Sequence, residues 1–177
     1  MTLIGGSVKD GYASTLSIKS TPQMVITLRA ATINDAEDVA EVYLNSRKAF
    51  LPYAPLIHSD VDIHEWVLNI LLPKGGVSVA EGGSGVIGMM GLSESEGFGW
   101  IDHLYLDPSA VGLGIGSSFV DRAKNELGEV IRLYAFQENV RCCRFYERHG
   151  FKAILSSDGS TNEEKCPDVL YQFAKRV

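Results

Sequence analysis

Apolar residues recur along this chain in two periods, one typical of helices and one typical of strands. Residues 114–127 predict a helix, because apolar side chains recur there at every fourth position. Residues 35–49 predict another. The buried stripe of that helix is expected to hold Ala36, Val39, Ala40, Val42, Tyr43 and Ser46. Two more helices are expected at residues 63–72 and 139–150.

Strand-like segments separate these helices. Short runs rich in valine, isoleucine and aromatic residues, bounded by glycine or polar turns, predict strands. They lie at residues 25–29, 77–82, 85–94, 99–107, 130–136, 151–157 and 168–176. After the two early helices, strands and helices alternate until two strands close the chain, and this order predicts an α/β (α+β) fold.

The first 23 residues differ from the rest of the chain. They are rich in serine, threonine and glycine and show little periodicity, which predicts a flexible extension outside the core. Met24 begins a segment that resembles the N-terminus of a protein. The alternative is therefore that Met24 is the true first residue and that residues 1–23 come from a start codon assigned too far upstream. Residues 24–177 suit a single domain.

Composition and charge narrow the class of partner. The 177 residues are 45% apolar and 21% charged, as in an ordinary globular domain. A formal net charge of −6 without a basic cluster argues against nucleic acid and mildly favours a cationic small partner. Cys142, Cys143 and Cys166 lack a CxxC spacing, which favours reduced thiols in a cytoplasmic protein. With no long apolar run and no secretory signal pattern, we expect no membrane association.

Three glycines at alternate positions, Gly112, Gly114 and Gly116, lie between a predicted strand and a predicted helix. Free N–H groups at a helix N-terminus bind phosphate oxygens, and glycines allow a ligand to approach closely. No lysine follows Gly116, which excludes a nucleotide-binding P-loop. The GxGxG spacing, late in the chain, does not fit a dinucleotide fingerprint. The alternative is a tight strand-to-helix turn without a ligand.

A second motif, QENVRCCRFYERHGF, follows the next predicted strand. Asn139 begins its helix and Tyr146 comes about two helical turns later, so both are expected on one side. Phe145 is expected to face the core. A phenol on the same side as a capping asparagine, soon after a phosphate-binding loop, indicates a functional site.

The two motifs, in this order, resemble the GNAT superfamily of acetyl-CoA-dependent N-acetyltransferases, and the opening ITLRAATINDAEDVAEVY resembles its first strand and helix. The resemblance covers roughly residues 25–175. It implies a single-domain GNAT-like fold, with a mixed central sheet of about six or seven strands flanked by helices. It also implies acetyl transfer from acetyl-CoA to a primary amine by direct attack in a ternary complex.

The resemblance gives each motif residue a role. The diphosphate of acetyl-CoA would lie against Val111, Gly112, Leu113, Gly114, Ile115, Gly116 and Ser117. The family usually has Arg or Gln where this chain has Val111, so a side-chain contact is missing. The main chain of Leu104, Tyr105 and Leu106 would pair with the pantetheine arm and polarise the thioester carbonyl. Asn139 would bind that arm or order the adjacent backbone, and Tyr146 would protonate the departing thiolate.

The reaction also needs a base, because an alkyl amine attacks only in its neutral form. Asp102 is the first candidate, since strand alternation places it on the same face as Leu104. Glu94 is the second and His103 the third, although His103 should face the other way. The acceptor pocket is expected in residues 47–75. Its candidate residues are Tyr53, His58, His64, Glu65 and Trp66.

Two functions of different classes fit these motifs. One is an N-acetyltransferase, and the other is a non-catalytic regulatory module that binds acetyl-CoA on the same fold. Val111 favours the module, whereas Tyr146 favours the enzyme, because pure binding needs no proton donor. The acceptor is either a small-molecule amine or a protein amine. We expect no metal site, because the spread of His and Glu does not match a metal spacing. A homodimer is a further possibility, since dimers are common in the family.

Overall fold

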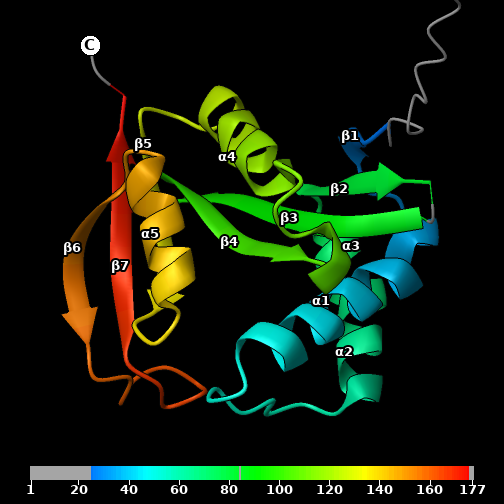
Figure 1. Ribbon diagram of the computed structural model, residues 1–177, viewed down its shortest axis with the longest axis horizontal. Helices are drawn as coiled ribbons and strands as arrows, with labels where there is room; N and C mark the ends of the chain where they lie inside the picture. Colours follow the sequence, from blue (N-terminus) through cyan, green and yellow to red (C-terminus); the bar gives the residue numbers. More distant parts are fainter. Residues whose placement is uncertain (1–24, 84, 176–177) are drawn as a thin grey trace, which may run out of the picture.

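The computed structural model describes residues 25–83 and 85–175 of the chain (Figure 1). The expected extension, residues 1–23, and Met24 lie outside the described residues. Seven strands form one sheet in the order β1-β2-β3-β4-β5-β7-β6. Strands β4 and β5 are parallel, and the other neighbouring strands are antiparallel. The predicted α/β fold with a mixed central sheet is therefore confirmed.

All the predicted strands and helices are present, with shifts at their ends. The strands are β1 (Thr27–Ala30), β2 (Val77–Gly82), β3 (Gly85–Ser95), β4 (Phe98–Leu106), β5 (Val130–Phe136), β6 (Lys152–Ser157) and β7 (Asp168–Ala174). The helices are α1 (Ala36–Phe50), α2 (Asp60–Trp66), α3 (Leu72–Lys74), α4 (Ile115–Glu126) and α5 (Val140–Arg148). A π-helical turn, Val67–Leu71, joins α2 to α3. Helix α2 begins earlier than predicted, because Ser59 and Asp62 form a capping box there.

Helices cover both faces of the sheet (Figure 1). Met89 and Val79 belong to a buried cluster with α1 and α2, whereas their chain neighbours Met90 and Ala80 belong to a cluster with α4. Because successive residues of a strand point to opposite faces, the two clusters lie on opposite sides of the sheet. The predicted stripe of α1 is only partly right, because Leu44 and Arg47 are also buried.

The parallel pair β4 and β5 separates after a short contact. The two strands pair only at Gly99 with Ile131 and at Trp100 with Arg132. Strand β4 continues to Leu106, and β5 continues to Phe136 against β7. The sheet therefore opens toward the C-terminal ends of its two parallel strands (Figure 1).

Strand β4 carries a β-bulge at Asp102. Gly91 of β3 pairs with His103 and Leu92 pairs with Ile101, so Asp102 is an extra residue in β4. Ile101 before the bulge and Leu104 after it both pack into the cluster with α4. The strict alternation from which the direction of Asp102 was predicted is therefore wrong at this point.

Candidate active site

The separated ends of β4 and β5 line a cleft of about 1470 Å³. Residues of α1, the start of α4, α5 and the β6–β7 loop complete its wall. Clefts that hold one drug-sized ligand have volumes of roughly 300–1,000 Å³, so this cleft has room for a large ligand and a second, smaller one. Asp102 and His103 also line an adjoining cavity of about 450 Å³, so they lie where the two spaces meet.

Most of the site residues predicted from the sequence line this cleft. They are Asp102, Leu104, Tyr105, Leu106, Val111, Gly112, Gly114, Gly116, Ser117, Asn139 and Tyr146. Leu113 and Ile115 do not line it, because the first is 47% exposed and the second is buried in the core. These two residues can offer only main-chain groups to a ligand.

The glycine loop leaves backbone groups open at the start of α4. Gly112 and Gly114 have φ angles of +94° and +84°, which L side chains rarely adopt, and a Cβ atom at either position would meet no atom within 4 Å. The N–H of Ser118 donates to the carbonyl of Gly114. The amides of the three residues between them have no intrahelical partner, and the helix dipole makes this end positive. The start of α4 therefore has open amides, and phosphate binding there stays a prediction.

Gly116 has a packing role instead. A Cβ atom there would lie 3.2 Å from Cζ of Phe145 and 3.8 Å from Cδ1 of Leu106. Phe145 packs against the cluster with α4, as its predicted core position requires, and its edge reaches the cleft. Because Gly116 has no side chain, Phe145 of α5 and Leu106 of β4 can pack directly against the first turn of α4.

The second motif places a protonated phenol in the cleft wall. Tyr146 is 5% exposed, and burial raises its pKa well above the usual value near 10. The phenol therefore keeps its proton across the physiological range. Asn139 Oδ1 accepts a hydrogen bond from the N–H of Cys142 at 3.1 Å and thereby caps α5. Burial raises the pKa of the Cys142 thiol to about 12, which keeps it from acting as a nucleophile.

The three candidate bases have different surroundings. Asp102 is exposed at the bulge and lines the cleft. His103 lines it too, although it was expected to face the other way, and its ring centroid lies 5.3 Å from that of Trp66. Burial lowers the pKa of His103, so its imidazole is neutral at pH 7. Glu94 pairs with Gly99 at the opposite end of β4 from Leu106 and lies outside the cleft, so its choice as a base is wrong.

Residues of α1, of α2 and of the loop between them form the far wall of the cleft. Of the predicted acceptor-pocket residues, Tyr53, His58 and Trp66 line it, whereas His64 and Glu65 do not. Burial raises the pKa of Tyr53 to about 12, and its buried hydroxyl has no hydrogen-bond partner. The wall thus offers an unused donor to a ligand.

Arg47 is a cleft residue that the sequence interpretation missed. It is 4% exposed, and its Nη1 donates to Glu164 Oε1 at 2.9 Å. Its Nη2 donates to the carbonyl of Pro55, while its buried Nε has no partner. One feature of the sequence could have indicated that Arg47 is buried: it lies one helical turn after Tyr43, which is on the predicted buried stripe of α1.

The separated strands β4 and β5, the glycine turn and the Tyr146 phenol meet at one cleft of this α/β domain. Residues 73–153 match the family model of the acetyltransferase (GNAT) domain. Both motifs lie within the matched residues, which confirms their resemblance to the GNAT superfamily. Among curated proteins, none matches the sequence.

Solved structures share this fold at low sequence identity. Apo YjaB from Escherichia coli has a TM-score of 0.69 and 22% identity, over 86% of this chain and 100% of that chain. The PaiA N-acetyltransferase from Thermoplasma acidophilum, in complex with coenzyme A, has a TM-score of 0.65 and 23% identity over the same shares. Ard1 from Thermoplasma volcanium has a TM-score of 0.66 and 18% identity, over 86% and 99%. None of the described helices is long and apolar enough to cross a membrane.

Proposed function

We propose that the protein is an N-acetyltransferase that moves the acetyl group of acetyl-CoA to a primary amine by direct attack in a ternary complex. The observation that carries this proposal is that the open amides of α4 and the phenol of Tyr146 border the same cleft. The family match and the coenzyme A bound to the PaiA relative support acetyl-CoA as the co-substrate.

The diphosphate would bind the free amides at the start of α4. Val111 supplies no positive charge. The exposed side chains of Arg141 and Arg148 line the same cleft and would supply positive charge in its place. The pantetheine arm would run along β4 at Leu104–Leu106, where that strand has lost its β5 partner. Main-chain groups of a free strand edge pair readily with an extended ligand.

The transfer forms a bond between nitrogen and the acetyl carbon and breaks the bond between that carbon and sulfur. Asp102, at the bulge, would take the amine proton through a water molecule. Tyr146 would donate its proton to the departing sulfur, and the resulting phenolate would be reprotonated from solvent. Because burial keeps the phenol protonated, Tyr146 is in the form that this step requires.

The acceptor side of the cleft suits a cationic amine. The carboxylates of Asp62, Asp102 and Glu163 line it and would attract a positive charge. Arg47 Nε and the Tyr53 hydroxyl are buried donors without partners, and unpaired buried donors are costly. An acceptor that also carries an oxygen atom would satisfy them, whether it is a small molecule or the end of a protein chain.

A thiol-release assay tests the proposal. The protein is mixed with acetyl-CoA and, in turn, polyamines, amino acids, aminoglycosides and peptides with free N-termini. Amine-dependent release of coenzyme A is the expected result. The alternative function, a non-catalytic regulatory module, is favoured by Val111 and predicts binding of acetyl-CoA without amine-dependent release in any of these mixtures.

A further inference from the structure

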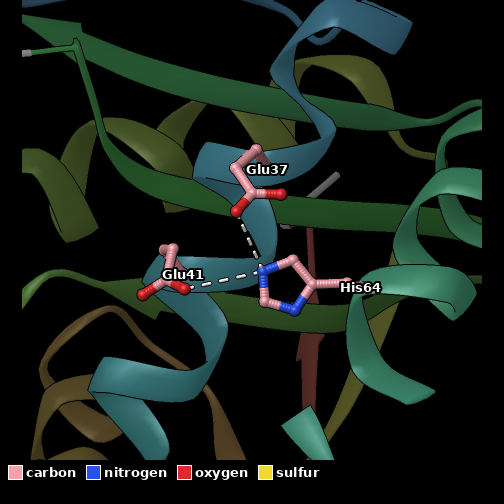
Figure 2. Close-up of side chains that lie close together, drawn as sticks. All are labelled: Glu37, Glu41 and His64. Carbon is pink, nitrogen blue, oxygen red and sulfur yellow. Dashed lines mark ion pairs between the residues drawn. The ribbon is translucent and has the colours of Figure 1, made fainter. Parts of the chain in front are cut away.

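Helices α1 and α2 bring together three metal-ligating side chains outside the cleft (Figure 2). Glu37 and Glu41 lie one turn apart on α1, and both face His64 of α2 (Figure 2). His64 Nε2 is 3.5 Å from Oε1 of each glutamate. The three ligand atoms lie within 4.8 Å of one another.

The surroundings of His64 leave one ring nitrogen free for a ligand. Its Nδ1 is 2.8 Å from the carbonyl oxygen of Asp60, one turn earlier in α2. A carbonyl can only accept, so Nδ1 carries a hydrogen and a neutral ring presents its lone pair at Nε2. Nε2 is buried and makes no hydrogen bond, although two carboxylates face it. Histidines that bind a metal usually donate their other ring N–H to a carboxylate or carbonyl, as this arrangement of His64 allows.

The distances fit an ion better than a direct hydrogen bond. Elsewhere in the chain, His58 Nε2 lies 2.7 Å from Glu163 Oε1, as expected of a hydrogen-bonded pair. Around a tetrahedral ion with bonds of roughly 2.0–2.1 Å, neighbouring ligand atoms are about 3.3 Å apart. The two separations of 3.5 Å at His64 are close to that value.

We propose that Glu37, Glu41 and His64 form a zinc-binding site with a water molecule as the fourth ligand. One imidazole nitrogen with two carboxylate oxygens suits Zn²⁺, whereas Mg²⁺ prefers oxygen ligands alone. The ion would tie α1 to α2, and these helices carry Tyr43, Arg47 and Trp66 into the cleft wall. It would therefore stabilise the acceptor wall and take no part in acetyl transfer.

Calorimetric titration of the full chain with Zn²⁺, after removal of metals with a chelator, tests the site. We expect one site in the micromolar range, weakened at least about tenfold by His64→Ala and by the double variant Glu37→Gln/Glu41→Gln. The glutamates are 78% and 53% exposed, so the double variant should fold. His58→Ala is the matched control and should bind as tightly as the unchanged chain.

Binding of Co²⁺ gives a second readout. A tetrahedral site of nitrogen and oxygen ligands shows visible absorption, which the double variant should lose, without the near-ultraviolet thiolate bands that cysteine ligands give. Absence of saturable Zn²⁺ binding would overturn the proposal. So would binding that survives in both the His64→Ala and the double variant, or a cobalt spectrum dominated by thiolate bands. None of these outcomes depends on the proposed acetyl transfer.

Discussion

Phe145 of α5 lies against Gly116 of α4 so closely that a Cβ atom at Gly116 would come within 3.2 Å of its ring. This contact joins the two motifs of the sequence, because one supplies the helix that begins at the glycine loop and the other supplies the helix with Tyr146. The positions of the open amides and of the phenol therefore depend on each other.

Gly116→Ala should disturb that junction. The Phe145 ring must shift by a few tenths of an ångström to admit the added methyl group, so we expect a loss of about 1 kcal/mol in the free energy of unfolding and weaker binding of acetyl-CoA. Urea unfolding and calorimetry measure the two effects. Gly128→Ala is the control, because a Cβ atom there would meet nothing within 4 Å. Identical behaviour of the two variants would contradict the packing role of Gly116.

Tyr146→Phe tests the proton donor. The variant keeps the ring but loses the O–H, so kcat should fall by about 10- to 1000-fold, whereas the affinity for acetyl-CoA should change little. Because burial raises the pKa of Tyr146 well above 10, deprotonation of this phenol should not reduce kcat between pH 7 and about 10. An unchanged kcat in Tyr146→Phe would remove the assigned role.

Substitutions at Asp102 and His103 separate the two remaining base candidates. We expect Asp102→Asn to lower kcat by about 10- to 100-fold and His103→Gln to lower it less. The reverse order would make His103 the base. Steady-state assays of thiol release, with the amine that gives the fastest release in the screen, measure kcat for both variants.

His103 should also affect stability through its pKa. Burial lowers the pKa of His103 in the folded state. Below about pH 6.5 this histidine is therefore protonated in the unfolded chain more than in the folded chain. The contribution of this residue to the free energy of unfolding is therefore greatest above pH 6.5 and falls as the pH is lowered. Urea unfolding at pH 5.5 and 7.5 should show a smaller pH effect in His103→Gln than in the unchanged chain. An equal pH effect in both proteins would show that another group is responsible.

Tyr53→Phe tests the donor on the acceptor wall. Loss of the unpartnered hydroxyl should raise KM for an oxygen-bearing amine by about 2- to 12-fold, the size of one hydrogen bond, and leave KM for acetyl-CoA unchanged. The same substitution should have no effect on an amine that lacks the oxygen. A matching rise of KM for acetyl-CoA would instead indicate that Tyr53 contacts the cofactor.

The sequence predicts the parts of this structure that depend on neighbouring residues. Helix and strand periods, the glycine turn before α4 and the cap at Asn139 are local, and each of them is present. The bulge at Asp102 is not a local feature, because it depends on the pairing register between β4 and β3. A period of two gives no sign of one extra residue in a strand.

Contacts between distant segments explain what the sequence pattern could not show. The charge of Arg47 is buried because Glu164, 117 positions away, reaches it, and the sequence pattern of α1 alone cannot supply that partner. Likewise, Glu37 and Glu41 show only helical spacing until the packing of α2 brings His64 against them. The spacing of His and Glu in the sequence therefore gave no sign of the cluster on which the zinc proposal rests.

Calorimetric titration with coenzyme A, and in parallel with pantetheine, tests the central claim that the amides of α4 hold the diphosphate. We predict one coenzyme A bound per chain and an affinity for pantetheine, which lacks the diphosphate, at least about 100-fold lower. Equal affinities for the two compounds, or no saturable binding of coenzyme A, would contradict the account.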